Sequence, residues 1–180
     1  MTTRLFRFDP TGAEAAPPLG DRADITVALA ARGVSLAAWP VPAPAAAEAL
    51  LAALAPALDA EAARFGYTSR DVVVVTPAQS GARTKFLAEH THADDEARFF
   101  AAGTGTFYLH YPEHAEVLAL VCAAGDWIRV PAGTAHWFDM GAAPDFTAVR
   151  LFTRPDGWVA AFTGAEPFRH FPSHDELAAR

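Results

Sequence analysis

The sequence predicts a mainly β fold, an antiparallel sandwich or barrel with helices packed on its outside. After Gly66, eight short runs rich in β-branched and aromatic residues follow one another, and Pro, Gly or Asp separates them about every ten residues. Before Gly66 the chain is rich in alanine and leucine, which favour helices. With 180 residues the chain is long enough to bury a core of its own, and we expect one domain over residues 1–180.

The first predicted elements are a strand and a helix. Residues 4–8 have the composition of a short strand, and a loop with proline and glycine is expected from there to Gly20. Asp24 is a candidate N-cap for a helix over residues 25–32. Gly33 then stands where a left-handed residue commonly ends a helix.

A second strand and a longer helix complete the N-terminal region. Residues 34–41, VSLAAWPV, predict a strand that prolines terminate. From Pro44 to Phe65, leucines at helical spacing predict an amphipathic helix; they are Leu50, Leu51, Leu54 and Leu58. Pro56 falls inside this helix, so we expect a kink or two helical pieces.

The β-rich part of the chain is predicted to form the barrel core over residues 67–164. Its eight runs are DVVVVTP, TKFLAEHTH, EARFFAAG, GTFYLHY, AEVLALVC, DWIRVP, FTAVRLF and GWVAAFTG. Residues 1–66 are expected to pack on this barrel, and residues 165–180 to form a tail that ends in a mobile DELAAR. No internal repeat or low-complexity linker divides the chain.

Charge and composition argue against several classes of partner. The net charge is −7 and no run of lysine and arginine occurs, so neither nucleic acid nor an anionic membrane surface is an expected partner. The N-terminus carries Arg4, Arg7 and Asp9 where a secretory signal needs an apolar core, and the apolar stretches are too short to span a bilayer. The single cysteine, Cys122, is expected to be a buried hydrophobe. We therefore expect a cytoplasmic protein that acts as a monomer.

Residues 89–100, EHTHADDEARFF, combine imidazoles, carboxylates and an apolar run. Side chains two residues apart in a strand point to the same side of the sheet. One face is therefore predicted to carry, in chain order, Phe86, His90, His92, Glu96, Arg98 and Phe100. Burying such polar groups without partners is costly, and a divalent cation would offset that cost by turning them into ligands.

Residues 125–138, GDWIRVPAGTAHWF, form a second polar element. A strand is predicted to end at Val130, and Pro131 and Gly133 then predict a tight turn. Such a turn aims His136 back into the barrel. Joined to the first cluster, it gives three histidines and one glutamate.

These two elements resemble the two motifs of the cupin superfamily. The matches are His90-x-His92-x3-Glu96-x6-Gly103 and Gly125-x5-Pro131-x-Gly133-x2-His136. Thr84 stands about where a glycine often opens the first motif, and Met140 stands where an asparagine often follows the second. Neither position is a ligand in the pattern. The resemblance implies a jelly-roll (cupin) β-barrel with flanking N-terminal α-helices, and metal ligands at His90, His92, Glu96 and His136.

Longer stretches resemble the acireductone dioxygenase family in particular. They are KFLAEHTHADDEARFF, VPAGTAHWFDMG, FTAVRLF and GWVAAFTG, and the similarity runs at least from Phe86 to Gly164. The resemblance implies an enzyme of methionine salvage that cleaves acireductone, 1,2-dihydroxy-3-keto-5-methylthiopentene, with O2. It also implies one Fe(II) or Ni(II) per chain. Iron would give formate and 4-methylthio-2-oxobutanoate, whereas nickel would give formate, carbon monoxide and 3-methylthiopropionate; the sequence does not choose between them.

Further residues near the motifs have two interpretations each. Arg98 either holds the anionic substrate, as a catalytic residue, or pairs with a nearby carboxylate. Five aromatic residues either shape an apolar slot for the substrate tail or fill the barrel core; they are Phe86, Phe100, Phe107, Trp137 and Phe138. Glu89 lies on the opposite side of the strand from His90, so it either supports the site from behind or is solvated.

The remaining acids and histidines are expected to have no role in the site. Asp94 and Asp95 are predicted to form a solvated turn between the ligands. Four histidines are expected at the surface: His110 and His114 beside a hairpin turn, and His170 and His174 in the tail.

Two other functions fit the same motifs. The chain is either another cupin dioxygenase that acts on a small enol or thiol, or a metal-stabilised cupin that binds a small molecule without turnover. Metal analysis of the purified protein, combined with O2 consumption in the presence of acireductone, separates these alternatives from the acireductone dioxygenase.

Overall fold

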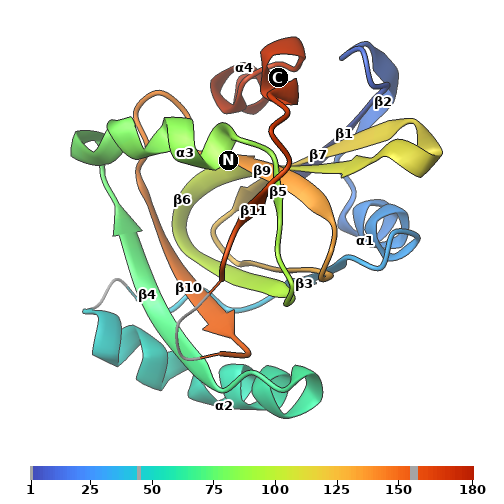
Figure 1. The fold of residues 1–180 in the computed structure, drawn as a ribbon. Coiled ribbons are helices and arrows are strands. Elements are labelled where there is room, and N and C mark those ends of the chain that lie inside the picture. Colours follow the sequence, from blue (N-terminus) through green and yellow to red (C-terminus); the bar gives the residue numbers. More distant parts are fainter. Residues whose placement is uncertain (1, 44–45, 155–157) are drawn as a thin grey trace.

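The computed structural model describes residues 2–43, 46–154 and 158–180, and its architecture is the predicted one (Figure 1). Eleven strands form an antiparallel sheet that folds into two layers, with helices outside. The strands are β1 (Arg4–Phe8), β2 (Glu14–Leu19), β3 (Ser35–Ala38), β4 (Ser69–Val75), β5 (His90–Thr91), β6 (Glu96–Tyr111), β7 (Glu116–Ala123), β8 (Asp126–Val130), β9 (Ala135–Asp139), β10 (Phe146–Phe152) and β11 (Ala161–Phe162). The helices are α1 (Arg22–Ala30), α2 (Ala47–Phe65), α3 (Arg83–Leu87) and α4 (His174–Ala178), with shorter 3-10 turns η1 (Pro77–Ala82), η2 (Pro112–His114) and η3 (Pro167–His170).

Strand β6 belongs to both layers. Its first residues pair with β8 and β10, and its later residues pair with β7 and β9. The change of layer occurs near Gly103, which has a φ of +71°. A side chain there would clash with the backbone of Asp145 and Phe146, so only glycine fits. The sequence predicted two separate strands in this region, and that prediction was wrong because β6 bends rather than ends.

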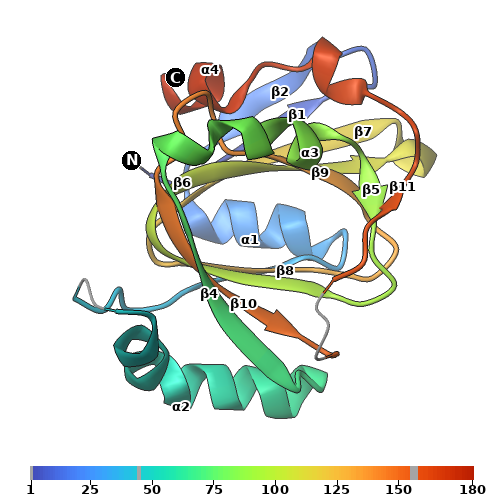
Figure 2. The same ribbon diagram turned by 60° about the vertical axis from the view of Figure 1, so that its left-hand side comes forward.

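The two layers can be followed in Figure 2. One layer has the strand order β11-β5-β9-β6-β7-β1-β2, and the other has β3-β8-β6-β10-β4. The main core lies between them and includes Ile25 and Leu29 of α1. Helix α2 covers the outer face of the second layer through Leu50, Leu54 and Leu58, as its helical spacing predicted. The N-terminal region thus contributes strands to the barrel as well as helices.

Two details of the N-terminal region differ from prediction. The expected loop before Gly20 contains β2, which pairs with β1. Helix α1 begins earlier than expected, and its N-cap is Asp21. The Asp21 carboxylate accepts hydrogen bonds from the backbone amides of Ala23 and Asp24. Asp24 lies inside the first turn instead. The two aspartates look alike in the sequence, and only the path of the chain decides which carboxylate reaches the free amides.

Helix α2 is continuous through Pro56, so the alternative of two pieces was wrong, whereas a kink at this residue stays a prediction. Proline removes one backbone hydrogen bond, whereas leucines on both sides of it are buried against the sheet, and that burial outweighs the loss. The expected start at Pro44 lies outside the described residues. The helix ends at Gly66 in a left-handed conformation.

The region before the first histidine is helical rather than extended. Phe86 lies in α3, and the strand that was predicted for residues 84–92 is reduced to β5. A capping box in which Thr76 and Gln79 satisfy each other's backbone amides starts the helical path at η1. In the predicted strand GWVAAFTG only β11 forms, and Gly157 lies outside the described residues.

The C-terminal end is helical and packed, so the prediction of a mobile end was wrong. A capping box of Ser173 and Glu176 starts α4, and Leu177 is completely buried. His174, which was expected at the surface, is also buried. Among the described residues, no helix is long and apolar enough to cross a membrane.

His174 joins α4 to the barrel. Its Nδ1 and Nε2 lie 2.8 and 3.0 Å from the hydroxyls of Thr106 and Thr104 on β6. Burial lowers the pKa of His174 from its ordinary value of 6.5, more than the carboxylates of Asp139 and Asp175 raise it. The unfolded chain therefore binds this proton more readily than the folded chain does. The contribution of the neutral His174 to the free energy of unfolding is fully present above about pH 6.5. It is lost as the pH falls towards the pKa of this residue in the folded state.

The first prediction concerns His174→Gln. At neutral pH the variant should be less stable by about 1–2 kcal/mol, because two buried hydrogen bonds change. Between about pH 7.5 and about pH 5, however, it should lose less stability than the parent protein, because one proton-linked group is gone. Urea unfolding at the two pH values measures both effects. His170→Gln, at an exposed position, is the control and should show the parent's pH dependence.

Candidate metal centre and its cavity

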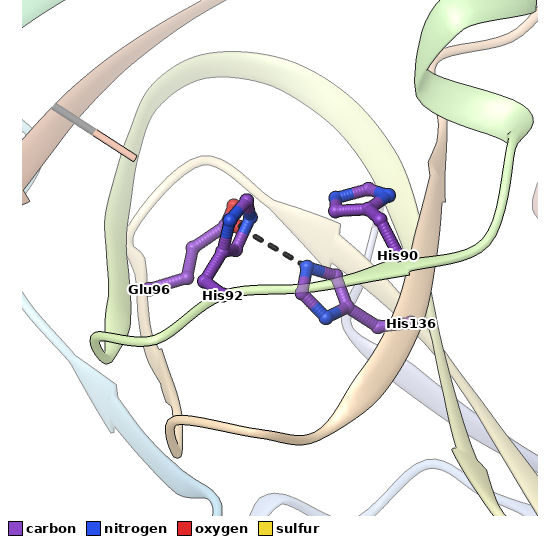
Figure 3. Close-up of side chains that lie close together, drawn as sticks. All are labelled: His90, His92, Glu96 and His136. Atoms are coloured by element: carbon purple, nitrogen blue, oxygen red, sulfur yellow. Dashed lines mark hydrogen bonds and ion pairs between the residues drawn. The ribbon is translucent and has the colours of Figure 1, made fainter. Parts of the chain in front are cut away.

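Four buried side chains meet at one end of the barrel (Figure 3). His90 comes from β5, His92 from the residue after it, Glu96 from the start of β6, and His136 from β9. One ligand atom from each lies within 4.8 Å of the other three. The structure therefore brings together all four residues of the predicted ligand set.

The sheet explains this convergence. His90 and His136 are register partners on β5 and β9, and their ring centroids are 4.5 Å apart. The amide of Gly133 donates to the carbonyl of His92 at 2.9 Å, which ties the turn of the second motif to the first motif. Gly133 itself has a φ of +77°, as a tight turn requires. The Nε2 atoms of His92 and His136 then lie 3.1 and 3.2 Å from Glu96 Oε2.

Backbone carbonyls set the orientation of all three imidazoles. The Nδ1 atoms of His90, His92 and His136 lie 2.8, 3.1 and 2.8 Å from the carbonyls of Ala88, Val159 and Thr134. A carbonyl oxygen can only accept, so each Nδ1 carries the proton. Nε2 of each ring is then the metal-binding atom, and in His92 and His136 it would give up the proton that it donates to Glu96.

Charge at the centre is balanced around Glu96. Burial raises the pKa of this carboxyl, but the Arg98 guanidinium and the hydrogen bonds from His136 and His92 outweigh burial and hold it well below its usual range. Burial lowers the pKa of His90, with a further contribution from His136. For His92, the hydrogen bond and charge of Glu96 outweigh burial and raise the pKa.

The donor set fits a divalent transition metal. Three neutral imidazole nitrogens and one carboxylate oxygen converge, and each ring is held by a partner on its far side. Imidazole suits iron, nickel, copper and zinc, whereas calcium and magnesium prefer oxygen ligands. Four protein ligands leave two positions of an octahedral ion for other molecules.

A cavity of about 370 Å³ opens above the four ligands. Two of its lining residues are arginines from neighbouring strands, Arg98 and Arg150, which are register partners on β6 and β10. The apolar lining comes mostly from aromatic side chains: Phe86, Phe138, Trp158 and Phe162. One part of the lining is thus formed by two arginines and another by aromatic rings, with the four candidate ligands between them.

Comparison with known proteins supports the motif analysis. The ARD/ARD′ family model matches residues 51–160. The chain is 49% identical over 172 residues to the acireductone dioxygenase of Frankia alni, covering 89% of this chain and 82% of that one. It is 41% identical to the acireductone dioxygenase of Marinobacter nauticus, covering 99% and 98%.

The chain belongs to the ARD/ARD′ family. The resemblance to the acireductone dioxygenase family, drawn from the longer stretches between Phe86 and Gly164, is therefore confirmed. A solved acireductone dioxygenase from Bacillus anthracis, with a cadmium ion in its active centre, superposes with a TM-score of 0.79 at 22% identity, covering 89% of this chain and 98% of that one. This likeness confirms the predicted fold class.

Of the five aromatic residues proposed for the substrate slot, two line the cavity among the described residues. They are Phe86 and Phe138. For Trp137 the core alternative holds, because this residue follows His136 on β9, points to the other face of the sheet and stacks on Tyr108 in a buried cluster. Phe100 and Phe107 are completely buried in the core with Phe138 and do not line the cavity.

Several cavity residues were missed by the sequence analysis. Lys85, Arg150, Trp158, Ala160 and Phe162 line the cavity. Arg150 had a detectable signal, because it is the single charged residue of the apolar run FTAVRLF. Its guanidinium is paired through two bonds with Asp71 of β4, at 2.9 and 2.6 Å. Nothing in the local pattern marked the other four.

Two residues that were expected to be solvated or at the surface make hydrogen bonds to other parts of the chain. Asp95 accepts from Arg129 Nε at 2.6 Å and from the amide of Ala132 at 2.9 Å, so the predicted solvated turn is tied to the second motif. His110, expected at the surface, is half-buried and lies 2.7 Å from a carboxylate oxygen of Glu89. Glu89 is itself buried, not solvated.

The other simple expectations hold. Asp94 is only partly buried, and its carboxylate lies 3.3 Å from the exposed Arg154 guanidinium. His114 and His170 are exposed, and Cys122 is completely buried as predicted.

The second prediction concerns the ligands themselves. His92→Ala or His136→Ala should lower affinity for a divalent metal by more than about 100-fold, because even losing a residue that only orients a ligand costs about 10–100-fold. The fold should survive, since its core comes from many strands. Elemental analysis measures the metal content, and circular dichroism checks that the fold survives. His170→Ala is the matched control, and full metal content in both cavity variants would contradict the ligand assignment.

Proposed function

We propose that the protein is a metal-dependent acireductone dioxygenase of methionine salvage, which cleaves 1,2-dihydroxy-3-keto-5-methylthiopentene with O2. The observation that carries this proposal is the buried cluster of three imidazoles and one carboxylate below a cavity with cationic and aromatic walls. Relatives named acireductone dioxygenase cover nearly the whole chain at 41–49% identity, which supports the same activity.

We further propose that His90, His92, Glu96 and His136 hold one Fe(II) or Ni(II) per chain. The cadmium ion named in the Bacillus anthracis structure supports a metal at this place. The bound ion would supply Lewis-acid stabilisation and orientation of the enediolate substrate.

Arg98 binds one oxygen of the Glu96 carboxylate and leaves the other oxygen to the imidazoles. Its guanidinium donates to Oε1 at 2.7 Å, which leaves Oε2 to face the imidazoles. It also lies over the rings of Phe138 and Phe107, at 4.6 and 5.1 Å from their centroids. This geometry favours the pairing interpretation of Arg98 without removing the other, because the side chain lines the cavity and its Nε has no partner among the described residues.

The cavity walls match the two ends of the substrate. The guanidinium groups of Arg98 and Arg150 would attract the anionic enediolate and hold it near the ligands. The methylthioethyl tail is apolar, and the aromatic wall would receive it and exclude water from the reacting carbons. The partners are then a small molecule and O2. The cytoplasmic location and the monomeric state remain predictions.

The third prediction concerns Arg98→Lys. The variant keeps the charge but loses the planar fork that positions Glu96, so turnover should fall at least about tenfold, equivalent to ~1.4 kcal/mol of barrier. Metal content should stay near that of the parent, because all four ligands remain. Steady-state kinetics with elemental analysis measure both. Arg70→Lys, in an exposed ion pair with Asp59, is the control; parent-like kinetics for Arg98→Lys would refute the role.

The fourth prediction concerns the choice of metal. Apo-protein reloaded with Fe(II) should release formate and 4-methylthio-2-oxobutanoate. The same preparation reloaded with Ni(II) should release formate, carbon monoxide and 3-methylthiopropionate, because the donor set accepts either ion. Gas analysis of the headspace and chromatography of the acids identify the products.

The same experiment tests the proposed function. No turnover of acireductone with any metal would refute it. Metal binding without O2 consumption would instead support the alternative of a cupin that binds a small molecule without turnover.

A further inference from the structure

Residues 158–163 form one side of the cavity and are called the cavity wall. Its alternate residues Trp158, Ala160 and Phe162 face the cavity. Between them, the carbonyl of Val159 accepts from His92 Nδ1 at 3.1 Å. The cavity wall therefore touches both the space for substrate and the orientation of one ligand.

Few contacts hold this wall to the barrel. Strand β11 is two residues long and pairs only with β5, at the end of its layer. The side chains of Val159 and Phe162 are 71% and 52% exposed, so little packs behind them. At its first residue, Trp158 Nε1 donates to the carbonyl of Asp95 at 3.1 Å. Trp158 also packs on Phe152, with ring centroids 4.6 Å apart, so its own contacts hold the first end of the wall. Packing gives the other end, at Phe162, less support.

The strongest attachment is at the other end, at Glu89. The amide of Thr163 donates to the Glu89 carbonyl at 3.0 Å, and the Thr163 hydroxyl donates to Glu89 Oε1 at 2.8 Å. The second carboxylate oxygen, Oε2, lies 2.7 Å from His110 Nδ1 on β6. Glu89 is only 5% exposed, and both of its oxygens are thus bonded. A buried carboxylate so arranged joins the rigid strand β6 to the wall.

We propose that the Glu89–Thr163 hydrogen bond is a positioning device that sets the affinity of the cavity for the apolar tail of the substrate. Glu89 does not line the cavity. It acts through Thr163, whose two bonds to Glu89 hold the neighbouring Phe162 in place. This inference rests on the proposed function, and it assigns tail recognition to a residue outside the cavity lining.

Thr163→Val and Thr163→Ser form a matched pair for the test. Valine keeps the branched shape and the backbone amide but removes the hydroxyl, whereas serine keeps the hydroxyl. Neither change removes a metal ligand, but the wall also carries the Val159 carbonyl that orients His92, so metal binding has to be checked. Both proteins are loaded with metal and their content is measured before use.

Two measurements follow. Amide hydrogen exchange over the peptide containing residues 158–163 reports how firmly the wall is held. Steady-state kinetics compare acireductone with an analogue in which a methyl group replaces the methylthioethyl tail. In Thr163→Val, exchange should quicken and the KM for acireductone should rise about tenfold, the effect of one hydrogen bond to a charged group. The KM for the methyl analogue should change by less than about twofold, because that compound does not reach the wall.

Thr163→Ser should behave as the parent protein in both measurements. Three outcomes overturn the proposal: parent-like exchange and KM in Thr163→Val, equal damage in Thr163→Ser, or an equal rise in KM for both substrates. If the parent protein turned over neither substrate, the proposed function would fail. The exchange rates would then still decide whether the Thr163 hydroxyl anchors the wall.

Discussion

The burial of the Glu96 carboxylate is the constraint on which the rest of the site depends. A carboxylate 4% exposed needs partners for both oxygens, and the structure supplies a guanidinium on one side and two imidazoles on the other. Each imidazole is in turn held by a backbone carbonyl on its far ring nitrogen. Removing any of these partners leaves a largely buried charged or polar group with fewer bonds, which costs free energy of folding.

The barrel makes this arrangement possible through β6. The strand starts at Glu96 in one layer and ends beside the histidine-bearing strands in the other. Arg98, two residues along, faces the same side as Glu96 and meets Arg150 across the β6–β10 pairing. The ligands, the cationic wall and the core aromatics are therefore set by the register of one bent strand. The turn at Gly133 closes the group by bonding to the carbonyl of His92.

Outside the ligands, support comes from residues to which the sequence assigned no definite role. Glu89 and His110 join β6 to the cavity wall, and Asp95 joins the loop between ligands to Arg129. His174 and Asp139 hold the C-terminal helix against β6 and β9. These contacts share a property: each connects residues more than twenty positions apart. Pattern analysis over short windows does not detect such pairs.

The sequence by itself determined the fold class, the family and the four candidate ligands. The fold class depends on short-range regularities, which are the short β-rich runs, the turn residues between them and the helical spacing of the leucines. The family and the ligand set come from the resemblance of the two motifs and their surroundings to known ones. Only the tertiary structure decided that residues 83–87 are helical, that β6 is one strand, and which aromatics reach the cavity. The physical reason is that a side chain's surroundings depend on which distant strand pairs with its own. Trp137 and Phe138 are neighbours in the chain, yet pleating sends one to the outer face and the other to the cavity.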